Sequence, residues 1–185
     1  MEQVQVYVIG VLVSNISGVL SRVSGMFTRR AFNIDTLTVS ETEVSGVSRI
    51  TVSFRGDDDM KEKIIRQLEK LQDVREVEVL DPSETVTRDL LLIKIRNKAE
   101  YRQDIMSAVE IFRSKIVDYT AETIICELTG ESSKIDAFIE LMKPYDIMEM
   151  CRTGIVALER GDNCLKTSDG LGDRKDSCTS HSKNR

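Results

Sequence analysis

The sequence predicts an α+β protein made of two tandem units, each with the order βαββαβ of a ferredoxin-like domain. Three observations predict this fold class. The chain has 185 residues, enough for two small domains, and its apolar pattern alternates between strand and helix periods in the same order twice. A polar break at residues 81–84 separates the two runs. Right-handed crossovers then place both helices of a unit on one face of its four-stranded sheet.

The first unit is expected at residues 4–80. Apolar residues that first alternate and then run continuously predict a strand at 4–13, and the spacing of Leu20, Val23 and Phe27 predicts a helix at 17–30. The rest of the unit is a hairpin, an acidic-capped helix and a last strand, expected at 34–43, 47–54, 57–71 and 74–80.

The second unit follows a linker at residues 81–86 and is expected at 87–160. It repeats the order of the first unit, and Pro144 ends its second helix. The predicted strands and helices lie at 90–95, 101–112, 115–120, 122–129, 131–143 and 147–158, the last as two pieces around residues 152–154.

The C-terminal segment, residues 161–185, has no aromatic residue, few aliphatic ones, and many Ser, Asp, Gly and Lys. This composition predicts a disordered tail. Residues 8–13, in contrast, are apolar on both faces of their strand, so both faces of the first sheet need a cover. Because a domain of this size buries little surface on its own, we expect dimerisation or packing between sheets.

Composition excludes several classes of function. The net charge is −5 and there is no Trp, so neither a nucleic-acid surface nor a base-stacking surface is expected. No apolar run is long enough to cross a membrane, and the N-terminus carries no basic leader. The simple expectation is a cytoplasmic protein with no membrane partner.

The sequence contains no coherent set of catalytic or metal-ligating residues. The only histidine, His181, lies in the predicted tail, so no catalytic triad can form around it. A metal site made by Cys164, Cys178 and His181 lacks a framework, and the acidic run at 57–59 is better explained as a helix cap than as a cation site. Cys126 lies in an apolar run, as a core cysteine does.

The loop between the first strand and the first helix is the candidate binding site. A strand that breaks on Asn, Ser and Gly leaves the first N–H groups of the helix uncovered, and the helix dipole makes them an anion site. The side-chain amides of Asn15 and of Asn33, at the start of the next strand, can bond the charged ends of an amino acid. Ile16 and Leu37 can cover its side chain. The alternative is an ordinary turn and cap. The candidate site residues are Asn15, Ile16, Ser17, Gly18, Val19, Leu20, Asn33 and Ile34.

An ordered set of segments resembles one known family. In the first unit these are NISGVLSRV (15–23), RAFNIDTLTV (30–39) and SRIT (48–51). In the second unit they are RDL (88–90), FRSKIVD (112–118), LTG (128–130), KIDAF (134–138) and RTGIVAL (152–158). The first unit resembles an ACT domain, a ferredoxin-like module that binds amino acids at dimer interfaces. The chain from residue 4 to residue 161 resembles the small, regulatory subunit of acetolactate synthase.

This resemblance implies a non-catalytic subunit that binds no cofactor of its own. Its partner is a separate catalytic (large) subunit, which carries thiamine diphosphate, FAD and Mg²⁺ and condenses pyruvate to acetolactate in branched-chain amino-acid synthesis. The small subunit raises that activity and confers feedback inhibition by valine, leucine or isoleucine. It forms a homodimer through its ACT domains, where Asn15 and Gly18 match the effector loop and Asn33 matches the residue across the interface.

The chain also departs from the family pattern. Ser14 stands where the family commonly has Glu, Ala31-Phe32 stands where it has Gly-Tyr, and Ile16 replaces a polar residue. These differences leave the identity of the effector open. The alternative function is a stand-alone ACT-domain amino-acid sensor that regulates another enzyme or transcription, and a third class is an enzyme on a ferredoxin-like scaffold.

Overall fold

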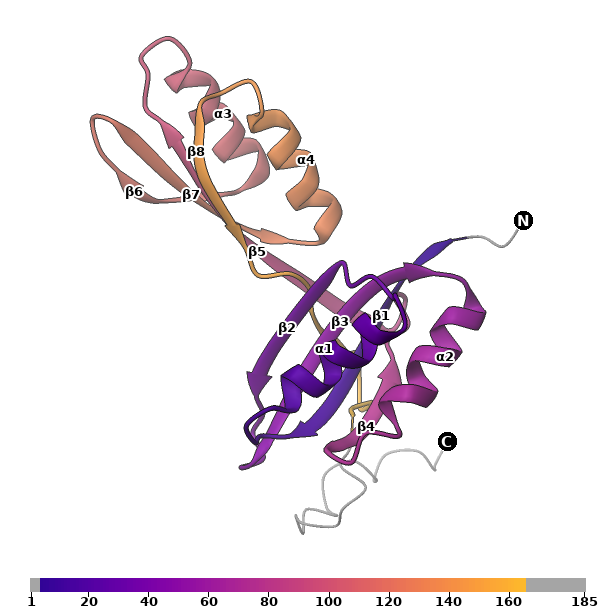
Figure 1. The fold of residues 1–185 in the computed structure, drawn as a ribbon. Coiled ribbons are helices and arrows are strands. Elements are labelled where there is room, and N and C mark those ends of the chain that lie inside the picture. The colour runs from indigo at the N-terminus through magenta and orange to yellow at the C-terminus, as the bar shows by residue number, and fades with distance from the viewer. Residues whose placement is uncertain (1–3, 166–185) are drawn as a thin grey trace, which may run out of the picture. The chain divides into compact units, whose positions relative to one another are not determined.

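A computed structural model describes residues 4–165 and divides the chain into two compact units (Figure 1). The first unit comprises the described parts of Met1–Val86 and Leu158–Arg185, and the second comprises Thr87–Ala157. Both are α+β with the order βαββαβ, so the predicted fold class is confirmed. The expected domain bounds of 4–80 and 87–160 stay predictions, and the expected tail lies outside the described residues from position 166 onward.

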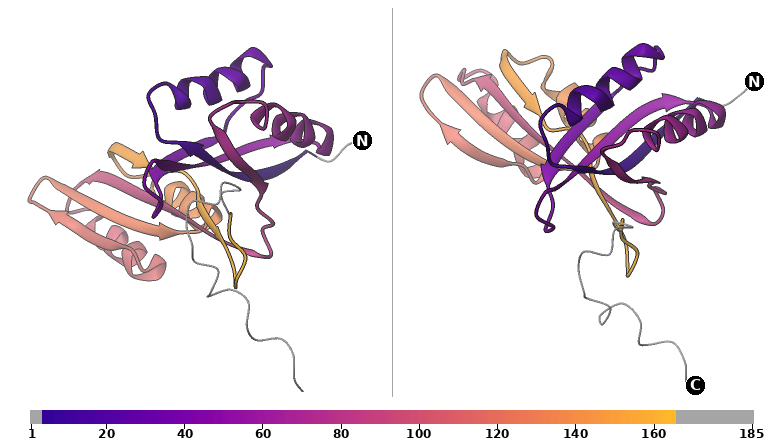
Figure 2. Two further views of the ribbon diagram at one scale, coloured as in Figure 1. Left: turned by 90° about the horizontal axis from the view of Figure 1, so that it is seen from below. Right: turned by 60° about the horizontal axis from the view of Figure 1, so that its bottom comes forward.

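The first unit is a four-stranded antiparallel sheet of order β2-β3-β1-β4, with both of its helices on one face (Figure 2). Strands β2 and β4 are the sheet edges. The elements are β1 (Gln5–Ser14), α1 (Val19–Arg29), β2 (Thr36–Glu41), β3 (Val47–Gly56), α2 (Asp58–Leu68) and β4 (Val74–Val79).

Helix α2 begins where the acidic run predicted a cap. The Asp57 side chain accepts a hydrogen bond from the Met60 N–H at 2.7 Å, and Asp58 and Asp59 occupy the first turn near the positive end of the helix dipole. The acidic run therefore has a structural role at this helix N-terminus.

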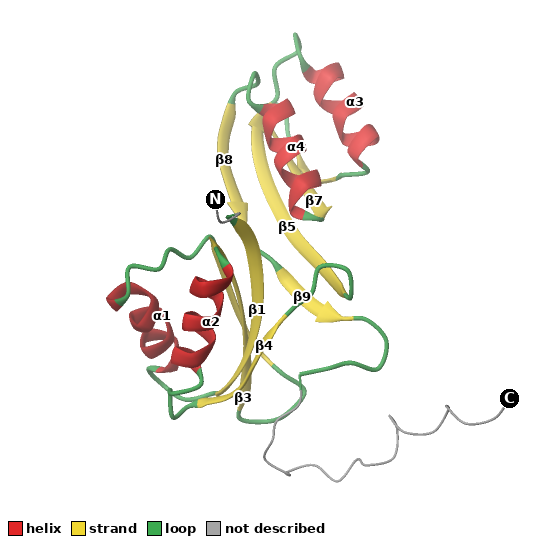
Figure 3. Ribbon diagram, turned by 90° about the vertical axis from the view of Figure 1, so that its right-hand side faces the viewer, coloured by secondary structure: helices red, strands yellow, loops and turns green. Residues whose placement is uncertain are grey.

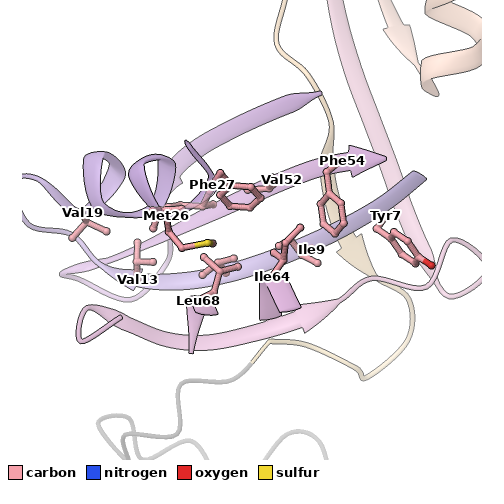
Figure 4. Close-up of a cluster of buried hydrophobic side chains, with 13 residues drawn as sticks. Tyr7, Ile9, Val13, Val19, Met26, Phe27, Val52, Phe54, Ile64 and Leu68 are labelled. Carbon is pink, nitrogen blue, oxygen red and sulfur yellow. The ribbon is translucent and has the colours of Figure 1, made fainter. Parts of the chain in front are cut away.

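The first core lies between the helices and the sheet (Figure 4). Alternate residues of β1 point into it, as Ile9 and Val11 do, while Phe27 and Phe54 fill its centre with almost no exposed surface. Phe54 also packs against Tyr7, with ring centroids 5.6 Å apart. Burial of such aromatic and aliphatic side chains is the main favourable term in the stability of this unit.

The second unit has a sheet of order β6-β7-β5-β8, with β9 pairing to β5, and α3 and α4 lie over one face of it (Figure 3). Strand β5 begins inside the segment expected to be a linker, because Thr85 and Val86 already pair as a strand. The two extended pieces expected near the C-terminus are present as β8 and β9. The elements are β5 (Thr85–Arg96), α3 (Arg102–Phe112), β6 (Lys115–Tyr119), β7 (Thr123–Gly130), α4 (Ser132–Met142), β8 (Ile147–Arg152) and β9 (Val156–Glu159).

The second core is centred on Phe138, which packs edge-on against Phe112 with ring centroids 5.2 Å apart. Cys126 is fully buried in this core, as its apolar sequence context predicted. Burial raises the pKa of its thiol to about 11, so the side chain is an uncharged packing residue. No helix among residues 4–165 is long and apolar enough to cross a membrane.

Candidate functional site

The loop between β1 and α1 contains Gly18 in the left-handed conformation. Gly18 is the residue that precedes the helix, and its φ of 86° lies in the left-handed region that favours glycine. No side chain caps the helix N-terminus at this position. Two main-chain hydrogen bonds hold the start of the loop. The Asn15 N–H donates to Gly46 O at 2.8 Å, and the Ile16 N–H donates to Ser14 O at 2.9 Å.

Several main-chain donors of this loop remain uncovered. The Val19 N–H reaches Ile16 O at 3.4 Å, and the Arg22 N–H donates to Gly18 O at 3.0 Å. Within the part of the chain that the structure describes, the N–H groups of Ser17, Gly18, Leu20 and Ser21 have no hydrogen-bond partner. A helix N-terminus with uncovered donors and no capping side chain is a site that favours a carboxylate.

Two charged side chains of opposite sign flank the loop. The Arg22 guanidinium lies against Gly18, where a Cβ atom would be 3.1 Å from Nη1, and its Nε donates to Asp73 at 2.6 Å. On the other side, Asn15 Nδ2 donates to Glu41 Oε1 at 2.8 Å. Positive charge near the helix N-terminus and negative charge near Asn15 match the two ends of a zwitterion.

Sequence reasoning did not single out Arg22 or Glu41. The signal for Arg22 was available, since a residue four positions after Gly18 lies one helical turn above the loop. Glu41 is 26 residues from its partner, and only the pairing of β2 with β3 brings it to this end of the sheet. No local pattern in the sequence marks such a contact.

The eight predicted site residues do not all lie together. Asn15, Ser17 and Gly18 are exposed in the loop, but Val19 is buried in the first core, and Ile34 packs against that core. Asn33 is exposed and lies beyond the start of β2, with its Nδ2 reaching the Asp35 carboxylate at 3.4 Å.

Within one chain, Asn33 and Asn15 are at opposite ends of the sheet. The N–H of Asp35 donates to Ser53 O, whereas Ser14 is paired with Val47. These two positions on β3, Ser53 and Val47, are six residue steps apart, which is roughly 20 Å along the strand. A single chain therefore does not bring the two amides to one ligand.

Exposed apolar side chains surround the loop. Ile16 and Leu20 are 55% and 44% exposed, and Val39 of β2 is 40% exposed. Leu37, expected to cover a ligand, is instead half-buried against the first core. The loop thus offers uncovered main-chain donors, opposite charges and an aliphatic surface. No group of three or more His, Cys, Asp or Glu residues is placed to hold a metal ion within residues 4–165.

Family comparisons match both units. An ACT-domain family described as "AHAS small subunit-like ACT domain" matches residues 9–76, and a family described as "Small subunit of acetolactate synthase" matches residues 88–161. The chain belongs to the acetolactate synthase small-subunit family. The resemblance seen in the sequence is therefore confirmed across both units.

Individual relatives of this small-subunit family agree. A probable acetolactate synthase small subunit of Methanothermobacter thermautotrophicus is 44% identical over 160 residues, which cover 86% of this chain and 95% of the relative. The small subunit of Bacillus subtilis is 44% identical over 156 residues, covering 83% and 90%. The crystal structure of the Thermotoga maritima small subunit is 42% identical with a TM-score of 0.80, covering 85% of this chain and 98% of that one.

Proposed function

We propose that this chain is a regulatory subunit that raises the activity of a separate acetolactate synthase catalytic subunit and confers feedback inhibition by a branched-chain amino acid. Family membership supports the partner, and the uncovered loop at Gly18 supports the effector site. The observation that carries the proposal is the set of main-chain donors that remain uncovered beside this glycine.

The effector binds as a zwitterion in this proposal. Its carboxylate accepts hydrogen bonds from the N–H groups that begin α1, close to the Arg22 guanidinium, and its ammonium group lies toward Glu41 and the Asn15 side-chain oxygen. Each charge-assisted bond contributes roughly 1.5–3 kcal/mol. Ile16 and Leu20 cover an aliphatic side chain, which favours valine, leucine or isoleucine over polar amino acids.

The site is completed by a second copy of the chain. In this homodimer, β2 of one copy pairs antiparallel with β2 of the other across a two-fold axis. The start of β2 in one copy then lies beside the end of β2 in the other copy. Asn33 of the partner subunit then reaches the loop that Asn15 begins. Effector binding thereby favours one arrangement of the homodimer, and a coupling of about 1–3 kcal/mol is enough for strong feedback.

The catalytic subunit supplies the chemistry. Thiamine diphosphate, FAD and Mg²⁺ belong to that subunit in the proposal, and this chain contributes no reacting group. Its residues act by binding the effector and holding the partner in a more active or a less active arrangement.

The test is reconstitution. The full chain is mixed with its catalytic subunit, and acetolactate formation is measured with and without valine, leucine and isoleucine. We expect the chain to increase the rate and at least one of the three amino acids to lower it again. A rate that is unchanged by the chain would contradict the regulatory role and would favour the stand-alone sensor. Activation without inhibition by any of the three would contradict the effector assignment.

A further inference from the structure

The Arg22 side chain joins the loop at Gly18 to the turn before β4. Arg22 lies one helical turn after the glycine, and its main-chain N–H donates to Gly18 O at 3.0 Å. Side chains of an α-helix lean toward the N-terminus of the helix, so the Arg22 guanidinium reaches back over the loop. A Cβ atom at Gly18 would be 3.1 Å from Arg22 Nη1, so the guanidinium lies close against the glycine.

Asp73 holds the guanidinium from the other side. Its carboxylate accepts a hydrogen bond from Arg22 Nε at 2.6 Å, and the Asp73 and Arg22 side chains are 18% and 47% exposed. Asp73 is itself fixed at the end of β1, because its main-chain oxygen accepts a hydrogen bond from the Ser14 N–H at 2.9 Å. Within residues 4–165, the N–H groups on Nη1 and Nη2 of Arg22 have no hydrogen-bond partner.

The N-terminus of α1 is an unfavourable place for an arginine by itself. The positive end of a helix dipole repels a cation and attracts an anion, and the carboxylate of Asp73 compensates this repulsion. An exposed ion pair adds little to the stability of a protein, so stability alone is a weak reason for this arrangement. The arrangement does leave cationic N–H groups of Arg22 beside the uncovered main-chain N–H groups of the loop.

The second unit has an aspartate at the same place with different partners. Asp146 precedes β8 as Asp73 precedes β4, and its main-chain oxygen accepts a hydrogen bond from the N–H of Arg96, the last residue of β5, at 3.0 Å. Its carboxylate pairs with Arg96 and Lys98 at 3.2 and 3.5 Å. An aspartate at this strand end is therefore compatible with different cations, and in the first unit it is directed at the arginine over the glycine.

We propose that Asp73 is a positioning residue of the effector site, which keeps the Nη groups of Arg22 over Gly18 so that they and the N–H groups of α1 bind the effector carboxylate together. This inference rests on the effector site proposed above and adds the residue that aims its cation. The effector carboxylate is the second anion on Arg22, while Asp73 keeps its place at Nε. A free carboxylate is then the part of the ligand that the site selects.

The test compares two ligands by calorimetric titration of the full chain. The first is whichever of valine, leucine and isoleucine binds the unaltered chain most tightly. The second is its carboxamide, which keeps the ammonium group and the side chain but lacks the negative charge. Asp73→Ala should weaken binding of the amino acid about three- to tenfold and leave binding of the carboxamide unchanged. A general distortion of the loop would weaken both ligands.

Arg22→Gln supplies a second measurement. It should weaken binding of the amino acid about tenfold or more. In the Arg22→Gln chain, Asp73→Ala should cost no further affinity, because the group that Asp73 positions is gone. The matched control is Asp146→Ala, at the corresponding aspartate of the second unit, which should bind the amino acid as the unaltered chain does.

The outcomes separate this inference from the proposed function. If none of the three amino acids binds the unaltered chain, the proposed effector site fails and the inference fails with it. If one of them binds and Asp73→Ala keeps its full affinity, or weakens the carboxamide equally, only the positioning role is overturned. Equal losses from Asp73→Ala with and without Arg22→Gln would also overturn it, because the aspartate would then act without the arginine.

Discussion

The turn before α1 and the turn before α3 are held by the same pattern of main-chain hydrogen bonds. They differ in their side chains, which leave the first turn open and fill the second. In the first unit, Asn15 N–H donates to Gly46 O and Ile16 N–H to Ser14 O, and in the second, Asn97 N–H donates to Glu122 O and Lys98 N–H to Arg96 O. This pattern is therefore a property of the βα connection in this fold. It does not by itself make a binding site.

Side chains close the second turn. Asn97 is 7% exposed, its Nδ2 donates to Thr120 O at 2.6 Å, and its Oδ1 accepts from Arg102 Nε at 2.6 Å. Tyr101 precedes α3 where Gly18 precedes α1, and its ring packs against Tyr145 at 5.3 Å. The comparison teaches that similar main-chain bonds hold both turns, while side chains fill the second turn and a glycine leaves the first one open.

The largest effect is expected from Gly18→Asp. The new carboxylate would pair with Arg22 and repel the carboxylate of the effector, and loss of two charge-assisted bonds at roughly 1.5–3 kcal/mol each weakens binding by at least ~100-fold. The measurement is inhibition of the reconstituted synthase by the effector, with activation retained. Gly18→Ala is the control, because it has the same backbone strain of about 1–2 kcal/mol without the charge. Unchanged inhibition in Gly18→Asp would remove this loop as the site.

The second-largest effect is expected from substitutions that truncate a core side chain in each unit. Phe54→Ala and Phe138→Ala each remove a fully buried ring, and each should lower the free energy of unfolding by about 3–5 kcal/mol. Hydrogen exchange should show the loss mainly in the unit that contains the substitution. Equal loss of protection in both units after either change would mean that the two cores do not act separately.

Crossed asparagine substitutions sharpen the comparison of the two turns. Asn97→Ala leaves the Thr120 carbonyl and the Arg102 guanidinium without their partner, at a cost of about 1–3 kcal/mol in unfolding free energy, with no effect on effector binding. Asn15→Ala loses only an exposed bond to Glu41, so stability changes by less than about 0.5 kcal/mol while effector affinity falls about tenfold. Denaturant titration and calorimetry give the two values. The reverse pattern would contradict the assignment of an open and a closed turn.

The smallest effect is expected in the reactivity of two cysteines toward a thiol reagent. Cys126 is buried with a thiol pKa of about 11, so almost none of it is thiolate near neutral pH, whereas Cys151 is exposed. A thiol reagent added to the folded chain should modify Cys151 and leave Cys126 intact until the protein unfolds. Mass spectrometry of the digested protein identifies the modified residue, and rapid labelling of Cys126 would show that the second core opens easily.

Local patterns predicted most of the fold. Alternation in the hairpins, the helical spacing of Leu20, Val23 and Phe27, and the cap at Asp57 are all read from neighbouring residues, and the structure contains each element. The start of β5 at Thr85 was missed because Asp81 and Pro82 suggested a longer break, while pairing of β9 with β5 extends the strand. Tertiary pairing decides such a boundary, and no local pattern records it.

The candidate loop was predictable only in part. Gly18 and Asn15 stood out because Asn and Gly mark turns and caps, and the second unit lacks such a glycine. The Glu41 contact and the burial of Val19, Ile34 and Leu37 depend on how β2 pairs and how α1 packs. The separation of Asn33 from Asn15 follows from sheet topology, so a site that uses both amides needs two copies of the chain.

Calorimetric titration of the full chain with valine, leucine and isoleucine tests the central claim most directly. The account predicts saturable heat with at least one of the three, at one site per chain, which Gly18→Asp abolishes and Asn97→Ala leaves intact. An absence of heat with all three amino acids would contradict the claim that uncovered main-chain donors at this glycine bind a free branched-chain amino acid.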